Sequence, residues 1–331
     1  MTLILTRSDV LTLLSRLGDD VEAAVERAHR DLALGEAVLP APPSMTAPGS
    51  DGAFLAMTAA SGPDRLASVK LLADLPGNRE RGLPVQRSAV LAVSTDTGAC
   101  EALVDGAAVT RARTAAATAV ATRALARTDA RVLGLVGTGP LAHAHAHAVL
   151  PTRDFDEVVL WGRTAEHARA LADRITGELG TKARVLTSVR AVVEACDVLC
   201  TLTPGREPVV HGAWLRPGQH VNAVGAPPRP DHRELDSEAV ARCRVVVDSS
   251  ATARAKSGDL LVPLAEGAVT EDVFALELGA VLASLAPGRT SDAEITLFDS
   301  VGIGLQDLTV TRLLVDRARR DGIGTVIDLA S

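Results

Sequence analysis

One stretch constrains the fold of this chain more than any other: a short apolar run that leads directly into closely spaced glycines. It reads RVLGLVGTGPLA over residues 131–142, and an alanine-rich, helix-compatible segment follows. Such a run is typical of a buried strand in a parallel sheet. In the spacing G-x-G-x-x-A, Gly137 permits a sharp turn, Gly139 lets the backbone approach a pyrophosphate, and Ala142 keeps the helix close to the sheet. The stretch therefore predicts a dinucleotide site; the alternative is a structural turn without a ligand. The expected cofactor-binding residues of this turn are Gly137, Thr138, Gly139, Pro140 and Leu141.

The chain after this stretch alternates between strand and helix patterns. The strand patterns are at 158–161, 183–186, 197–202, 220–224 and 244–248, and the first three are separated by helical patterns at 164–179 and 188–195. Such alternation predicts the α/β class, a doubly wound parallel sheet with right-handed crossovers. A helix near 271–285 and a last strand at 295–298 complete this expectation.

The first third of the chain has a different pattern. Two helical patterns within 7–34 precede short strand patterns at 54–57, 67–72 and 88–94, and the turn Thr97-Gly98 starts a returning strand. We expect a second, α+β domain here, and we expect a helix at 303–319 and the tail 322–329 to pack back on it. The expected domains are 1–115 with 304–331, and 116–303. Because short strands with exposed edges invite pairing, this block also predicts a symmetric dimer.

The composition excludes several classes of protein. The formal net charge is −7, aromatic residues make up 2%, and tyrosine is absent, so there is neither a basic patch nor a base-stacking surface for nucleic acid. No apolar run is long enough to cross a bilayer, and no signal-peptide pattern opens the chain. The four cysteines lack zinc or disulfide spacing, so we interpret them as buried thiols of a cytoplasmic protein. His143, His145 and His147 lack the acid of an H-E-x-x-H site, so no metal is predicted.

The end of the second strand pattern bears on which dinucleotide binds. It reads Gly162-Arg163-Thr164, without the acidic residue that usually binds the ribose 2′-hydroxyl of NAD. Arg163 and Thr164 are instead suited to a 2′-phosphate, so NADPH is the expected cofactor, with NAD(H) as the alternative. The other interpretation is that Thr164 caps the next helix and Arg163 is solvated.

Two cations are candidate substrate groups. Lys70 lies within the apolar pattern SVKLL, and an alternating strand by itself favours a solvent-facing lysine. If Lys70 instead faces a cleft, burial lowers its pKa and suits it to protonate or polarise a carbonyl or imine. Arg113 is suited to bind a substrate carboxylate, and is equally suited to the surface.

Taken together, these residues resemble the ornithine cyclodeaminase/mu-crystallin family over nearly the whole chain. The motifs that carry the resemblance are Lys70, NRERGLP (78–84), TRARTAA (110–116), GTG (137–139), REP (206–208), VNAVGA (221–226), RELD (233–236), SGD (257–259), PGRT (287–290) and FDSVG (298–302).

The resemblance implies a homodimer, a Rossmann-like domain between two chain ends that form a substrate and dimerisation domain, and an amino or imino acid lying over the nicotinamide. It implies that Lys70 acts near the reacting carbon or carboxylate and that Arg113 binds the carboxylate. The further residues implied at the cofactor and substrate are Ser44, Met57, Thr201, Leu202, Val224, Gly225, Ser300 and Val301.

Two departures from the family pattern bear on the substrate. Residues 42–45 read PPSM, where the family often has a basic residue that helps to bind carboxylate. Cyclodeaminases also carry an aspartate directly after the stretch that here ends at Gly225. In this chain the nearest carboxylate is Asp231, which is a second candidate catalytic residue.

The predicted activity is therefore NAD(P)H-dependent reduction of an imine of an α-keto acid, or the reverse amino-acid dehydrogenation. One alternative is an ornithine- or lysine-type cyclodeaminase with tightly bound NAD. A second is a non-catalytic NADPH-binding protein of the crystallin kind. The expected ligand is a small amino, imino or keto acid.

Overall fold

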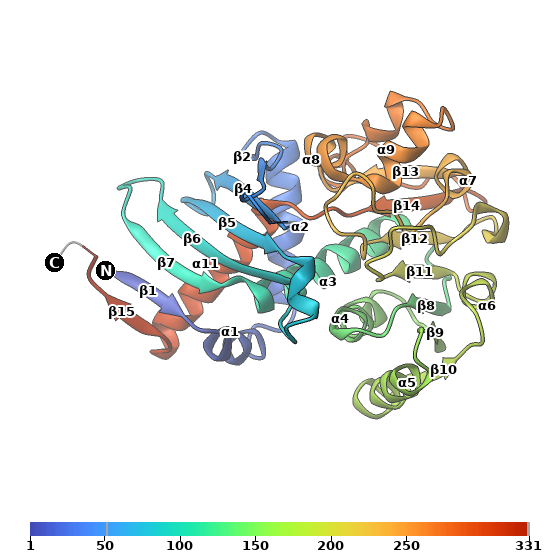
Figure 1. Ribbon diagram of the computed structural model, residues 1–331, viewed down its shortest axis with the longest axis horizontal. Helices are drawn as coiled ribbons and strands as arrows, with labels where there is room; N and C mark the ends of the chain where they lie inside the picture. The colour runs from blue at the N-terminus through green and yellow to red at the C-terminus, as the bar shows by residue number, and fades with distance from the viewer. Residues whose placement is uncertain (51, 330–331) are drawn as a thin grey trace. The chain divides into compact units, whose positions relative to one another are not determined.

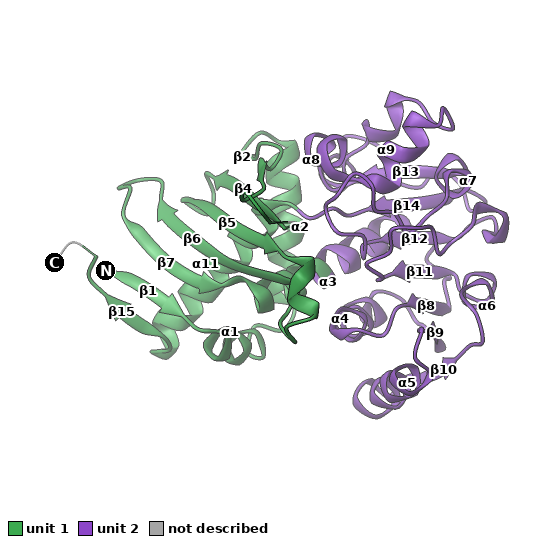
Figure 2. Cartoon of the chain, viewed as in Figure 1, with its two compact units in different colours: residues 1–114, 303–331 green, residues 115–302 purple. Residues whose placement is uncertain are grey.

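The alternating strands and helices fold into one of two compact units, in which the strands form a parallel sheet (Figure 1). The structure is a computed structural model and describes residues 1–50 and 52–329. The chain divides into Met1–Thr114 with Ile303–Ser331, called unit 1, and Ala115–Gly302, called unit 2; Figure 2 colours them separately. The expected domain boundaries, 115/116 and 303/304, each lie one residue later than the boundaries of these units.

Unit 2 contains a sheet whose strands all pair in parallel. Within the described residues it has seven strands, in the order β10-β9-β8-β11-β12-β14-β13. Their bounds are β8 (Val132–Val136), β9 (Glu157–Trp161), β10 (Lys182–Val185), β11 (Val198–Thr201), β12 (His220–Ala223), β13 (Cys243–Val247) and β14 (Ile295–Asp299). The strand order reverses direction at β8, as in doubly wound folds, which bind ligands beyond the carboxyl ends of the strands at that point. The predicted α/β fold class is confirmed.

The helices of unit 2 differ from the expectation in one segment. They are α4 (Pro140–Val149), α5 (Ala165–Leu179), α6 (Val189–Ala195), α7 (Ser237–Ala241), α8 (Ser250–Lys256), α9 (Gly258–Ala265) and α10 (Leu278–Leu282), and α3 (Gly106–Leu125) enters from unit 1. The single helix expected near 271–285 is wrong: a 3-10 turn at Glu271–Phe274 is separated from α10. The backbone between them is extended, because the Val247 N–H donates to the Leu276 carbonyl oxygen at 2.9 Å.

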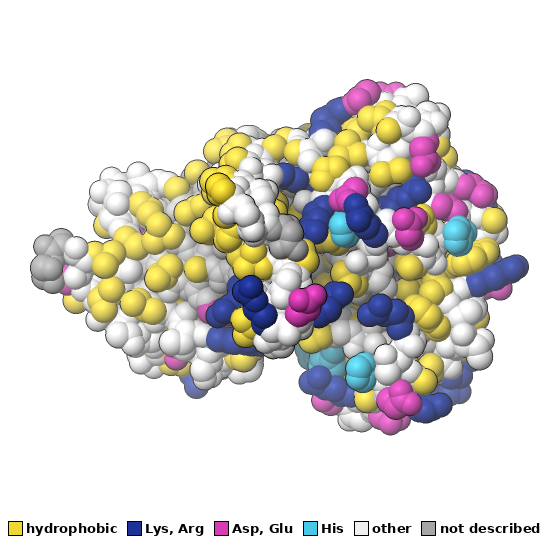
Figure 3. Space-filling view, in the orientation of Figure 1, with side chains coloured by type: hydrophobic (Ala, Val, Ile, Leu, Met, Phe, Trp, Pro, Cys, Tyr) yellow, Lys and Arg dark blue, Asp and Glu magenta, His cyan; other side chains and the backbone are white. Residues whose placement is uncertain are grey.

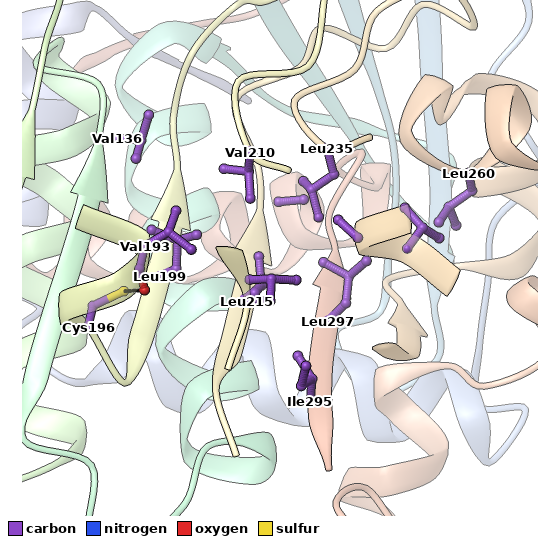
Figure 4. Close-up of a cluster of buried hydrophobic side chains, with 14 of the residues drawn as sticks. Val136, Val193, Cys196, Leu199, Val210, Leu215, Leu235, Leu260, Ile295 and Leu297 are labelled. Carbon is purple, nitrogen blue, oxygen red and sulfur yellow. Dashed lines mark hydrogen bonds between the residues drawn. The ribbon is translucent and has the colours of Figure 1, made fainter. Parts of the chain in front are cut away.

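Each face of this sheet has its own hydrophobic core. Leu199 and Leu297 belong to the core in Figure 4, whereas Val198 and Cys200 belong to the core on the other face. Successive residues of a strand point to opposite faces, so a strand buried on both faces is apolar throughout. This is why the strand patterns of unit 2 are continuous rather than alternating.

Unit 1 contains a mainly antiparallel sheet. Within the described residues it has eight strands, in the order β15-β1-β7-β6-β5-β4-β2, with β3 paired to β4. Their bounds are β1 (Thr2–Leu5), β2 (Ala37–Val38), β3 (Ser44–Met45), β4 (Ala53–Ser61), β5 (Leu66–Asp74), β6 (Gln86–Ser94), β7 (Cys100–Asp105) and β15 (Thr325–Ile327). The tail packs back as expected, because β15 pairs with β1.

The two faces of this sheet differ. Helices α1 (Arg7–Leu14), α2 (Asp20–Ala33) and α11 (Gly304–Asp321) pack on one face. The other face carries Thr58, Val69, Leu91 and Leu103 as one cross-strand row. Figure 3 shows hydrophobic side chains gathered over these strands. Within the described residues, no helix is long and apolar enough to span a membrane.

Candidate functional site

The glycine turn joins β8 to α4 at the carboxyl edge of the unit 2 sheet. Gly137 has φ +123°, and a Cβ there would lie 2.8 Å from the Leu202 carbonyl oxygen, so only glycine fits. Gly139 is the N-cap of α4 and Pro140 is its first residue. A Cβ on Gly139 would meet no protein atom within 4 Å, so the space beside its backbone is open. Open space at a helix N-terminus suits a pyrophosphate, so the residues present fit a dinucleotide.

The end of β9 lies directly beside this turn. A Cβ on Gly162 would lie 2.4 Å from Thr138 Cγ2, so the two segments are in contact only because residue 162 is glycine. Arg163 and Thr164 are exposed. Thr164 is the N-cap of α5, yet its side chain makes no capping hydrogen bond. Its hydroxyl is therefore not used in the way that the alternative interpretation expects.

The loops after β11 and β12 are held by a residue to which the sequence analysis gave no role. The carboxylate of Glu234 is fully buried and accepts hydrogen bonds from Thr201 Oγ1 (2.7 Å), from Thr203 N (2.6 Å) and Oγ1 (2.7 Å), and from Gly225 N (2.7 Å). The Thr201 hydroxyl thus binds protein rather than facing outward. Of the other residues expected near the cofactor, Leu202 and Val224 are each 8% exposed.

A second buried carboxylate supports Glu234. Asp259 Oδ1 accepts from the backbone N–H groups of Glu234 and Leu235, both at 2.8 Å. Burial and the nearby Glu234 carboxylate raise the pKa of Asp259 to about 7. Asp299, at the end of β14, likewise has its pKa raised well above the ordinary value, first by burial and then by Asp259. Ser300 and Val301, which follow, line a cavity of about 10 Å³ together with Asp259 and Asp299.

Lys70 occupies the helix-covered face of the unit 1 sheet. It lies in the middle of β5, between Met57 of β4 and Val90 of β6, and is 1% exposed. Its Nζ lies 2.6 Å from Asp307 Oδ2 on α11. The solvent-facing interpretation of Lys70 is therefore wrong, because the strand places Leu71, and not Lys70, on the exposed face.

Arg113 is also buried, with 5% exposure, so the surface interpretation is wrong for this residue too. Its Nε lies 3.4 Å from Asp307 Oδ1, and its Nη1 donates to Gln306 Oε1 at 2.9 Å. Gln306 Nε2 in turn lies 3.0 Å from Nε2 of His29. Burial lowers the pKa of His29 to about 4, so this histidine is neutral and accepts the hydrogen bond from the amide.

The remaining candidates lie elsewhere within their units. Met57 packs with Leu55 and Leu72 in a hydrophobic cluster, and Ser44 is an exposed residue of β3. Asp231 of unit 2 is exposed; it forms an ion pair with Arg206, and its Oδ1 lies 2.9 Å from His232 Nδ1. The hydrogen bond from His232, with that from Arg206, lowers the pKa of Asp231.

The histidines after the glycine turn contact different partners and do not converge on one point. His145 is buried against Thr118 Oγ1 at 3.0 Å, whereas His143 pairs with Glu178 at 2.8 Å. In the part of the chain that the structure describes, no group of three or more His, Cys, Asp or Glu side chains is arranged to hold a metal ion.

Sequence reasoning missed Asp307, Gln306 and Glu234. Gln306 and Asp307 stand in the first turn of a long helical pattern, where an acid is commonly explained by the helix dipole. The available signal was their position among the apolar residues of GLQDLTV, which places polar groups on a face that must be buried.

Comparison with known proteins gives a consistent result. The family model described as "Ornithine cyclodeaminase/mu-crystallin family" matches residues 1–322. An alanine dehydrogenase of Archaeoglobus fulgidus is 35% identical over 330 residues, which cover 98% of each chain. The structure of Thermococcus litoralis Δ1-pyrroline-2-carboxylate reductase in complex with NADH and L-proline is 34% identical, with a TM-score of 0.93, covering 98% of this chain and 100% of that one.

A further structure is an archaeal alanine dehydrogenase dimer with bound NAD. It is 33% identical, with a TM-score of 0.92 over 99% of both chains. These relatives are alanine dehydrogenases and an imino-acid reductase, and each matches at least 98% of this chain. The predicted family and the predicted class, an NAD(P)-dependent oxidoreductase acting on CH–NH2 or C=N bonds, are confirmed.

Proposed function

Because the chain belongs to the ornithine cyclodeaminase/mu-crystallin family, we propose that it reduces an imine of a small α-keto acid, or catalyses the reverse amino-acid dehydrogenation. The observation that carries this proposal is the burial of Lys70 and Arg113 around one carboxylate. A reductase of imino acids needs a proton donor for nitrogen and a fixed cation for the carboxylate, and these two residues supply that pair.

Each group has a distinct role in this proposal. The nicotinamide cofactor supplies the hydride when bound. Lys70 holds the proton on the imine nitrogen, which makes the neighbouring carbon electrophilic, and this suits a lysine whose pKa burial lowers to about 8. Arg113 binds the adjacent carboxylate. Asp231 is the second candidate catalytic residue, and Ser44, Met57, Ser300 and Val301 are proposed around the substrate.

The proposed cofactor site is the edge of the unit 2 sheet. Gly137, Thr138, Gly139, Pro140 and Leu141 form its pyrophosphate turn, and Leu202, Val224 and Gly225 lie on its other loops. Thr201 is retained as a positioning residue, because its hydroxyl holds Glu234. We further propose a preference for NADPH, supported by exposed Arg163 and Thr164 and by the absence of an acid between Trp161 and Ala165.

The protein is proposed to be a symmetric homodimer. The face of the unit 1 sheet opposite its helices bears a shallow groove of about 410 Å³, and its apolar lining includes Val38, Ala60, Val69, Leu91 and Val93. Apolar area of this kind is stabilised by covering it, and a second copy of the chain supplies the same surface. A cytoplasmic location belongs to this proposal and is supported by four free cysteines.

One substrate screen tests the proposed function. NADPH and NADH oxidation would be followed with Δ1-pyrroline-2-carboxylate, and with pyruvate and other α-keto acids in the presence of ammonia or methylamine. We expect turnover of at least one imine and none of the α-keto acids without an amine. No oxidation with any imine, together with no reverse reaction on alanine or proline, would contradict the proposal.

A further inference from the structure

The helix-covered face of the unit 1 sheet carries two cations and one carboxylate at a single point. Lys70 Nζ lies 2.6 Å from Asp307 Oδ2, and Arg113 Nε lies 3.4 Å from Asp307 Oδ1. All three side chains are buried. One positive charge is left over within this cluster, because His29, which is linked to Arg113 through Gln306, is held neutral by burial. A buried surplus of positive charge favours an incoming anion.

A glycine brings Asp307 to this point. A Cβ on Gly304, the first residue of α11, would lie 3.0 Å from the carbonyl carbon of Met57, so glycine allows the helix to start in contact with β4. Asp307 follows one turn later on the same side of the helix. Lys70 is the cross-strand partner of Met57. The short helix-to-strand distance therefore places the carboxylate directly over the lysine.

We propose that Asp307 is a positioning residue for the reduction proposed above. One of its oxygens holds the Lys70 ammonium at a fixed point, and the other sets the plane of the Arg113 guanidinium. Gln306 completes the arrangement by accepting from Nη1, which leaves Nη2 as the donor toward a substrate carboxylate. This inference rests on the proposed function, because the two cations that Asp307 holds are the groups assigned to the imine nitrogen and the carboxylate.

The charge of Asp307 also affects the pH at which Lys70 loses its proton. Burial lowers the pKa of Lys70 to about 8, Asp307 raises it, and Arg113 lowers it. Without the carboxylate charge, burial and Arg113 remain, so the ammonium is lost at a lower pH. The groups that surround Lys70 on the packed elements are Met57 of β4, Val90 of β6, Thr110 and Arg113 of α3, and Asp307 of α11.

The first test measures the pKa of Lys70 directly and does not depend on turnover. The chain has three lysines, Lys70, Lys182 and Lys256, so a protein labelled with 13C-lysine gives three ε-carbon NMR signals, and Lys70→Met identifies one of them. We expect that signal to titrate near pH 8 in the unmodified protein and at least ~1 unit lower in Asp307→Asn. The matched control is Asp316→Asn, on the exposed side of the same helix, which should leave the titration unchanged. An unshifted titration in Asp307→Asn would overturn the proposal.

The second test is kinetic. Turnover of an imine found in the screen should fall at least ~10-fold in Asp307→Asn, with the alkaline fall in kcat moved to lower pH and NADPH affinity kept. In Asp307→Glu, which keeps the charge but displaces it, the Lys70 titration should stay near that of the unmodified protein while kcat falls. If Asp307→Asn does not fold, Asp307→Glu decides: a lowered Lys70 titration or a fully retained kcat overturns the inference. If the NMR shift is found but no imine is turned over, the proposed function alone fails.

Discussion

At the scale of single residues, the candidate site consists of polar groups placed where the surroundings are apolar. Lys70 is the clearest case, because a buried ammonium is tolerated only beside a countercharge, which Asp307 supplies at 2.6 Å. Asp307 and Arg113 come from different helices, so their pairing could not be predicted from sequence spacing. The prediction of Lys70 and Arg113 as site residues came from family resemblance, whereas the pattern of the strand alone favoured solvent.

Arg163 provides a prediction about the cofactor. The side chain is exposed at the end of β9, where a 2′-phosphate would form a charge-assisted hydrogen bond. We expect NADPH to bind several-fold tighter than NADH, and Arg163→Ala to remove most of that preference, worth about 1–3 kcal/mol. Arg169→Ala, an exposed arginine of α5, is the matched control. Equal dissociation constants for the two dinucleotides in the unmodified protein, measured by calorimetry, would contradict this assignment.

At the scale of elements, the loops at the carboxyl edge of the unit 2 sheet are tied together by buried carboxylates. Glu234 binds the loops after β11 and β12, and Asp259 binds the backbone that carries Glu234. The contacts of Glu234 with Thr201 and with Asp259 join residues 33 and 25 positions apart in the sequence, so no local pattern predicted them. The strands and most helices were predictable, because the glycine turn and the apolar runs are local signals. The helix expected near 271–285 was not, because pairing with Val247 overrode its helical pattern.

Asp259 gives this edge a dependence on pH. Its pKa is about 7 in the folded protein and near 4 in an unfolded chain, so the folded state keeps the proton to a higher pH. The folded protein therefore loses stability as the pH rises from about 4 to about 7. Asp259→Asn keeps the acceptor for both N–H groups and removes the ionisation. The free energy of unfolding of Asp259→Asn, relative to the unmodified protein, should therefore rise by on the order of 1–3 kcal/mol from pH 4 to pH 8. Urea unfolding at several pH values measures it, with exposed Asp173→Asn as the control; a constant difference would contradict the prediction.

At the scale of the whole molecule, the two-unit organisation was predictable from a change in pattern along the chain. The first third is rich in strand patterns, whereas the chain after the glycine turn alternates between strand and helix patterns. The pairing of β15 with β1 explains why the tail returns to the N-terminal block. The apolar outer face of the unit 1 sheet was less predictable, because strand patterns at 67–72 and 88–94 do not reveal which face the helices cover. That face is the basis of the proposed dimer.

The dimer prediction is tested on Leu91, which is 37% exposed at the centre of this face. We expect a dimer by light scattering at micromolar concentration. Leu91→Glu should weaken association at least ~10-fold, about 1.4 kcal/mol, because a carboxylate would be buried against apolar side chains. Leu11→Glu, at an exposed leucine of α1, should leave the dimer intact. A monomer in the unmodified protein would contradict the proposal.

The central claim is that Lys70 holds the proton for reduction of an imine. The measurement that tests it most directly is kcat for reduction of Δ1-pyrroline-2-carboxylate, or of another imine turned over in the screen, by Lys70→Met. Exposed Lys182→Met is the control. We predict that Lys70→Met lowers kcat by about 10²–10⁴-fold, with NADPH affinity nearly unchanged and the control at full rate. Full turnover by Lys70→Met would contradict the account and would make Asp231 the next residue to test.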